Sequence, residues 1–212
     1  MMEVKDYQLF FSNLSKLLLF INAILFFKYY IKQKKVFKIF TWYLLFIFIL
    51  QIISFIFWYK GKNNLYLSHF YFIIQFLFLS LFYATLFKSK KQKITVLLSA
   101  TVVILIITVQ YVQTPSLYHK FNLLEIVLTS LVIVSFSVIH FYNSLTEKTD
   151  FIYINSGIFI YLLSSTLIFC SGNFVNESNA SLNKFLWLFN SILFVLYQVL
   201  IFTEWFKSYR NK

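Results

Sequence analysis

Ionisable and polar side chains are few inside the long apolar stretches of this chain, and they are the residues that could do chemistry there. His69, Glu125 and Asn190 each follow the start of an apolar stretch by four or five residues. A histidine beside a carboxylate changes its charge near neutral pH, which suits a ligand sensor, a pH sensor or a proton-coupled step. We therefore predict a ligand-binding polar layer in which Glu125 is the anion and His69 is its proton-responsive partner.

A second set of polar residues lies toward the opposite ends of three apolar stretches. His140, Asn155 and Glu204 predict a second polar layer, which could serve acid–base chemistry on a lipid. For both layers the alternative is structural, because polar groups that bond between membrane helices hold the register of those helices for about 1 kcal/mol or less each. The sequence leaves both interpretations open.

Familiar catalytic and metal-binding patterns do not occur in the sequence. His69, His119 and His140 fall at different depths of the expected helices, so they do not predict a shared metal site. Cys170 is the only cysteine and predicts neither a disulfide nor a redox pair. HExxH and GxSxG motifs and glycine-rich phosphate loops are also missing. We predict no catalytic residue, no metal and no cofactor.

The composition indicates which kind of fold carries these residues. Of the 212 residues, 60% are hydrophobic and only 12% are charged, whereas soluble domains have about 25% charged residues. With 3 Gly and 1 Pro the apolar stretches are almost unbroken, and continuous helix satisfies every backbone group internally, as hydrocarbon requires. The sequence predicts an all-α integral membrane bundle and excludes a water-soluble domain.

Seven stretches are long enough to cross a bilayer as helices, which takes about 20 apolar residues each. We predict a single transmembrane domain over residues 1–212 with seven transmembrane helices, at about residues 8–31, 39–59, 65–87, 94–112, 121–142, 151–170 and 185–206. Helical phase places His69, Ser80 and Tyr83 on one face of the third span. That face should look into the bundle.

Three glutamines and one glycine predict contacts between the helices. Gln51, Gln75 and Gln198 lie near the middle of their spans, where each amide must find a partner. Gly157 lies on the same face of the sixth span as Tyr161, and a small residue there allows another helix to approach closely. We expect bonds between helices at the glutamines and close packing at Gly157.

The distribution of positive charge predicts an orientation. The formal net charge is +12, but the lysines lie in short loops beside apolar stretches, so they indicate topology and predict no nucleic-acid partner. Residues 28–38, 88–93, 148 and 207–212 hold 13 of the 19 Lys and Arg residues. Because cytoplasmic loops carry the excess, we predict the N-terminus outside and the C-terminus in the cytoplasm.

Three segments carry a resemblance to a known group of proteins. Residues 64–76 (NLYLSHFYFIIQF), 151–169 (FIYINSGIFIYLLSSTLIF) and 187–207 (WLFNSILFVLYQVLIFTEWFK) resemble a loose group of small multi-pass membrane proteins of Bacteroidetes with no assigned activity. The resemblance implies an accessory or sensory membrane component, since some of these proteins are encoded near histidine kinases. It also implies the inner (plasma) membrane of a bacterium as the location. The pattern of that group has a carboxylate at the position of Gln75. Because this chain has an amide there instead, the resemblance implies no proton-linked role for this position.

Together these observations predict a non-enzymatic membrane sensor or accessory signalling subunit, whose helix packing responds to a ligand, a proton or the state of the bilayer. The alternatives are a small solute transporter or channel that uses the buried polar groups as a path, and an intramembrane lipid-modifying enzyme. The expected partners are membrane lipids, a membrane or cytoplasmic signalling protein that reads the loops at residues 32–38 and 88–93 and the tail at residues 207–212, or a second copy of the chain.

Overall fold

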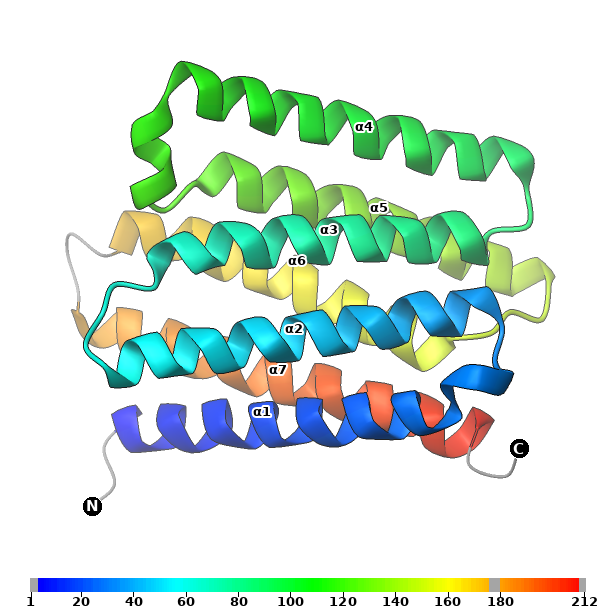
Figure 1. Cartoon of the computed structure of the whole chain (residues 1–212), viewed down its shortest axis with the longest axis horizontal. Coiled ribbons are helices and arrows are strands. Elements are labelled where there is room, and N and C mark those ends of the chain that lie inside the picture. Colours follow the sequence, from blue (N-terminus) through cyan, green and yellow to red (C-terminus); the bar gives the residue numbers. More distant parts are fainter. Residues whose placement is uncertain (1–3, 176–179, 210–212) are drawn as a thin grey trace. The chain divides into compact units, whose positions relative to one another are not determined.

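The computed structural model of the chain describes residues 4–175 and 180–209, with the side chains among them except those of residues 172–181. Its elements are α1 (Val4–Tyr29), the short 3-10 helix η1 (Tyr30–Lys32), α2 (Lys35–Tyr59), α3 (Leu65–Leu86), α4 (Lys90–Gln113), the 3-10 helix η2 (Pro115–His119), α5 (Leu123–Thr146), α6 (Ile152–Val175) and α7 (Ala180–Ser208) (Figure 1). In this described part of the chain, seven helices are long and apolar enough to cross a membrane. The predicted all-α architecture and the predicted number of helices are confirmed.

The helices extend beyond the apolar stretches at several ends. α4 begins at Lys90 and α7 at Ala180, which is four and five residues before the predicted starts at residues 94 and 185. Lysine and glutamine are good helix formers, so α4 continues through KKQK although these residues lie outside the hydrophobic run. Pro115 begins η2 and lies outside every long helix, as expected for a residue that cannot donate a backbone hydrogen bond.

The chain forms two compact units. One unit, here called the central unit, is Phe26–Phe136, and the other, here called the terminal unit, combines Met1–Leu25 with Ser137–Lys212. The prediction of a single domain over the whole chain stays a prediction. Each unit is described by itself below.

In the central unit α2 and α3 form an antiparallel pair, and α4 packs beside α3 (Figure 1). Gly61 has a φ of 64° in the turn between α2 and α3, a left-handed backbone conformation that glycine adopts without steric cost. Asn64 donates from Nδ2 to Ser54 Oγ at 2.9 Å and so ties the turn to α2. Aromatic rings fill the interior, for example Phe40 against Phe82 with ring centroids 5.4 Å apart.

In the terminal unit α6 and α7 pack closely along their length. A Cβ atom added to Gly157 would lie 2.6 Å from Tyr197 Cδ2, and the Tyr197 ring stacks on Tyr161 with centroids 5.5 Å apart. The predicted close approach at Gly157 is therefore confirmed. Asn22 on α1 donates from Nδ2 to Gln198 Oε1 at 3.0 Å, which confirms the predicted bond between helices at Gln198.

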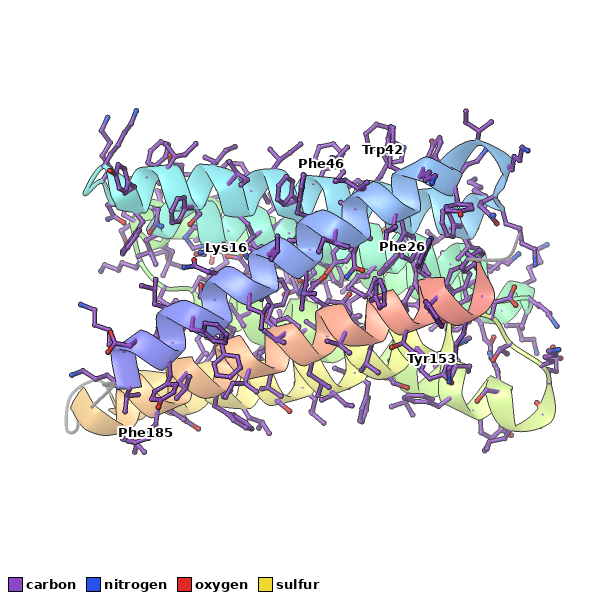
Figure 2. The ribbon with its side chains drawn as sticks, turned by 90° about the horizontal axis from the view of Figure 1, so that it is seen from below. Lys16, Phe26, Trp42, Phe46, Tyr153 and Phe185 are labelled. Atoms are coloured by element: carbon purple, nitrogen blue, oxygen red, sulfur yellow. The ribbon has the colours of Figure 1, made fainter. Side chains whose placement is uncertain are left out.

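Large apolar side chains remain exposed along the helices. On α2, Trp42 and Phe46 project outward from the ribbon (Figure 2), and each is 39% exposed. α4 has the smallest buried share of the seven candidate spans in the described chain, and its exposed residues include Leu98, Val102 and Leu105. Such extensive apolar exposure is what lipid chains cover in a membrane protein.

Candidate functional site

Three polar side chains from different helices meet in the central unit and are here called the histidine cluster: His69 of α3, Tyr111 of α4 and Glu125 of α5. His69 Nδ1 lies 2.9 Å from Glu125 Oε2 and 2.8 Å from the Tyr111 hydroxyl oxygen. The Tyr111 hydroxyl also donates to Glu125 Oε2. His69 is 3% exposed and Glu125 is 0% exposed, so the pair is removed from solvent.

The ends of the helices hold the histidine cluster in place. Asn122 precedes α5 and accepts the backbone N–H of Glu125 on its Oδ1 at 3.3 Å, which is the bond of a helix N-cap. The same side chain donates from Nδ2 to Gln110 Oε1 at 3.0 Å, so the cap also fixes the last turn of α4. Thr129 donates to the backbone oxygen of Glu125 at 2.7 Å. These bonds bring Tyr111 and Glu125 to the depth of His69.

Tyr118 of η2 covers the histidine cluster. Its ring stacks on the imidazole of His69 with centroids 5.8 Å apart and an interplanar angle of 28°. The rings of Tyr66 and Phe70 of α3 also pack against the Tyr118 ring, with centroid distances of 6.5 Å and 6.4 Å. Tyr118 is 39% exposed, whereas His69 beneath it is 3% exposed. The η2 segment is therefore the part of the site that lies nearest to the surface.

Two buried atoms of the histidine cluster have no hydrogen-bond partner among the described residues: His69 Nε2 and Glu125 Oε1. Buried polar groups usually have partners, and each exception asks for an explanation. A neutral imidazole that donates from Nδ1 leaves Nε2 as an acceptor, while an imidazolium leaves it as a donor. In either form, no bond within the cluster depends on Nε2 or on Oε1.

The first predicted layer is assembled in part. His69 and Glu125 are brought together in the central unit as predicted, while Asn190 of α7 belongs to the terminal unit. Asn190 Oδ1 is buried and has no partner among the described side chains. Its membership of the layer stays a prediction. Tyr111 was not predicted, although its position in the last turn of the fourth span matches the depth of Glu125 near the start of the fifth.

The second predicted layer lies in the terminal unit, where each of its residues bonds to a neighbouring segment. His140 Nε2 lies 3.1 Å from the backbone oxygen of Asp150. Asn155 donates from Nδ2 to the backbone oxygen of Ser137 at 3.2 Å, and Ser137 returns a bond from Oγ to the backbone oxygen of Asn155 at 3.3 Å. These bonds join α5 to α6 and are of the kind that holds helix register. They favour the structural interpretation of the layer.

Glu204 of α7 caps the start of α6. Its Oε2 accepts the backbone N–H of Tyr153 at 3.0 Å, and its Oε1 accepts the Ser208 hydroxyl at 2.9 Å. A carboxylate is favourable there because the first backbone N–H groups of a helix lack partners. The residue before α6, Phe151, has a φ of 66°, an uncommon value for a bulky side chain. Glu204 therefore stabilises the strained entry into α6.

The end of α7 adds further contacts around this cap. Lys207 Nζ donates to the Tyr153 hydroxyl at 2.5 Å and lies 4.5 Å from the centre of its ring; Tyr153 marks this end of α6 in Figure 2. Burial, together with the nearby charges of Glu204 and Asp150, raises the pKa of Tyr209 above its ordinary value. Tyr209 therefore stays neutral at physiological pH beside these carboxylates.

Other polar groups along α3 are buried without a bond in the part of the chain that the structure describes. Gln75 Oε1 and Ser80 Oγ have no partner there, and both residues are 3% exposed. Within the described residues the Gln75 oxygen thus makes no bond between helices, in contrast to that of Gln198, and the bond predicted for the Gln75 amide stays a prediction. Among residues 4–175 and 180–209, no group of three or more His, Cys, Asp or Glu residues could hold a metal ion.

The histidine cluster is the arrangement with the clearest chemical potential, since it places a titratable pair out of water and under an aromatic cover. Comparison of the chain with protein-family models, with curated proteins and with solved structures finds no match.

Proposed function

We propose that this chain is a non-enzymatic sensor or accessory signalling subunit that crosses the inner membrane of a bacterium seven times. Its stimulus is the proton, and the receiver is the His69–Glu125 pair of the histidine cluster. The response is a change in how α3, α4 and α5 pack. A membrane or cytoplasmic signalling partner, as the resemblance to the Bacteroidetes proteins implies, reads that change.

The observation that carries this proposal is the burial of His69 and Glu125 in direct contact. With one proton shared between imidazole and carboxylate the pair has no net charge. Loss of this proton leaves a net negative charge, and gain of a second leaves a net positive charge. A net charge in an apolar interior is costly, so both changes weaken the packing around the cluster.

The position of the cluster offers a route from the stimulus to a partner. Its members lie on three helices, so a change of charge acts on the packing of all three. α3 runs without a break from His69 to Leu86, and the lysine-rich loop at residues 88–93 follows it. A shift of α3 at its start would therefore move this loop, which is the segment that we propose a partner reads.

The membrane setting follows from the length of the helices and the distribution of charge. The seven candidate spans hold the apolar surface that lipid would cover. In the orientation that the lysines favour, the turn at residues 60–64 and η2 face the outside. The histidine cluster would then lie beneath the external surface and would respond to external pH.

Hydrogen–deuterium exchange of the reconstituted protein at a series of pH values tests the proposal. We expect the protection of residues 110–125 to change with pH, in a transition that belongs to the coupled His69–Glu125 pair. The transition should be absent in His69→Gln and in Glu125→Gln. The exposed turn at residues 60–64 serves as the internal reference for the intrinsic effect of pH on exchange.

His119→Gln is the matched control variant, because His119 lies beside Tyr118 on η2 but is exposed and outside the cluster. It should keep the transition of the natural protein. A transition that survives His69→Gln, or one that disappears in His119→Gln, would contradict the proposal.

A second candidate function is a small transporter or channel, and one observation favours it. Gln75 and Ser80 carry buried oxygens without described partners on the same helix as His69, and such groups could line a polar path. Flux of protons or small solutes into proteoliposomes should then fall in His69→Ala and Glu125→Ala. Flux that persists in both variants would remove this candidate.

A further inference from the structure

One exposed face of α2 changes along its length from charged to aromatic to apolar. Lys35, Lys38, Trp42, Phe46 and Ile49 are spaced by three and four residues, so they share this face. Trp42 and Phe46 are each 39% exposed and Ile49 is 43% exposed, and Figure 2 shows the outward direction of Trp42 and Phe46. We call these five residues the α2 strip.

The charged end of the α2 strip is joined to Tyr30 of η1. The indole N–H of Trp42 donates to the Tyr30 hydroxyl at 3.0 Å, and Lys38 Nζ lies 5.4 Å from the centre of the Tyr30 ring. Because the Tyr30 oxygen already accepts this bond, its own proton is available to an acceptor. The Lys38 ammonium and the Tyr30 hydroxyl thus lie together as donors, and Lys35 precedes Lys38 by about one turn on the same face.

The surrounding charge at this end of the central unit is strongly positive. The antiparallel pair of α2 and α3, with α4 beside α3, brings the start of α2, the end of α3 and the start of α4 to the same end (Figure 1). Nine of the 12 lysines of residues 26–136 lie there: Lys28, Lys32, Lys34, Lys35, Lys38, Lys88, Lys90, Lys91 and Lys93. The only acidic residue in this range is Glu125, which is buried with His69 near the opposite ends of these helices.

We propose that the α2 strip binds one anionic phospholipid. The lipid phosphate lies at Lys35, Lys38 and the Tyr30 hydroxyl, and one acyl chain runs along Trp42, Phe46 and Ile49. The order of donors, aromatic rings and apolar side chains is the order of headgroup, interface and hydrocarbon in a lipid. An acidic protein would need the charges but would have no use for the apolar continuation. The proposal rests on the insertion of the chain in a membrane and is independent of the proton response.

Quenching of Trp42 fluorescence by brominated lipids tests the proposal on the full chain. The protein carries Trp58→Phe, Trp187→Phe and Trp205→Phe together, so that Trp42 is its only tryptophan. It is reconstituted into two kinds of bilayer, which contain the same fraction of either brominated phosphatidylglycerol or brominated phosphatidylcholine. We expect phosphatidylglycerol to quench Trp42 more strongly. Lys35→Gln and Lys38→Gln should each lower the relative association of phosphatidylglycerol by roughly fivefold, and added salt should lower it further.

Lys60→Gln with Lys62→Gln is the matched control, because these lysines lie at the other end of α2, and it should leave the preference unchanged. Native mass spectrometry of the protein with all its tryptophans, purified in detergent, gives an independent count of retained phosphatidylglycerol. That count should fall in the double variant that combines Lys35→Gln with Lys38→Gln. It should not fall in the control. This second measurement covers the case in which the tryptophan substitutions disturb folding.

Several outcomes would overturn the proposal. Equal quenching by the two lipids would show that the strip has no preference for an anionic headgroup. Displacement of the lipid by soluble glycerol phosphate would assign the donors to a free phosphate. Protection of Lys35 and Lys38 from amine labelling by polyglutamate, without a lipid preference, would assign them to an acidic protein. Absence of quenching by either lipid would contradict membrane insertion itself, and with it the proposed function.

Discussion

Tyr111 and His69 share one oxygen of the Glu125 carboxylate. Glu125 Oε2 accepts the Tyr111 proton while it contacts His69 Nδ1. A buried carboxylate depends on such donors. If a donor is removed, the cost of taking the carboxylate oxygen out of water is no longer offset by a hydrogen bond. Tyr111 therefore stabilises the charged form of Glu125 and links α4 to the His69–Glu125 pair.

Replacement of Tyr111 by Phe tests this role. Tyr111→Phe keeps the ring and removes the donor, so we expect the free energy of unfolding to fall by about 1–3 kcal/mol. The loss should shrink in acid, because a protonated Glu125 needs the donor less. Unfolding of the reconstituted protein in SDS, measured at two pH values, checks both statements.

Tyr66→Phe provides the comparison for this measurement, because Tyr66 contacts Tyr118 and Phe57 through its ring. Its effect on unfolding should be small and independent of pH. If Tyr111→Phe proves as stable as Tyr66→Phe, the hydroxyl of Tyr111 does not support Glu125.

At the residue scale the sequence predicts the site in part. His69 and Glu125 stand out because an ionisable side chain inside an apolar stretch is costly and needs a partner. Tyr111 does not stand out, since the chain has 15 tyrosines and most of them suit a membrane interface equally well. The role of Glu204 at the start of α6 could not be predicted either, because a cap from another helix depends on how α6 and α7 meet.

Among the elements, the α6–α7 pair shows how closely two helices can approach. Gly157 faces the Tyr197 ring, which is 2% exposed and stacked on Tyr161. A buried ring in a stack cannot move aside freely. A glycine is therefore required at this contact by space, whereas at Gly61 the backbone conformation requires it.

Gly157→Ala should destabilise the protein. The added Cβ would meet Tyr197 Cδ2 at 2.6 Å, and overpacking of this kind costs about 1–3 kcal/mol, against a gain in helix propensity of up to about 1 kcal/mol. SDS-induced unfolding should show a net loss that is largely restored by Tyr197→Leu in the same chain. Ser156→Ala, one residue away, should be close to neutral. A stable Gly157→Ala protein would contradict the close packing of α6 on α7.

Element positions follow from the sequence because each apolar stretch has the length of a membrane helix. Helix ends are less predictable, as α4 and α7 show, since polar residues continue a helix without contributing to its hydrophobic run. The side-chain oxygens of Gln198 and Gln75 differ in their partners for a similar reason. Whether a mid-span amide meets a partner depends on the facing helix, which for Gln198 supplies Asn22.

For the protein as a whole, the distribution of lysines and the position of the histidine cluster together indicate an orientation in the membrane. The lysine-rich loops and the cluster lie toward opposite ends of α3, so one end would face the cytoplasm and the other the outside. An external proton would then reach the cluster beneath η2, and the loop at residues 88–93 would carry the response. This arrangement depends on seven crossings with the N-terminus outside.

Cysteine accessibility in intact cells tests that arrangement most directly. In a Cys170→Ser background, Lys62→Cys and Lys120→Cys should react with a membrane-impermeant maleimide added outside. Lys34→Cys and Lys90→Cys should react only after the membrane is opened. External labelling at position 34 or 90, or protection of position 120 in intact cells, would place the histidine cluster toward the cytoplasm and contradict the proposed orientation.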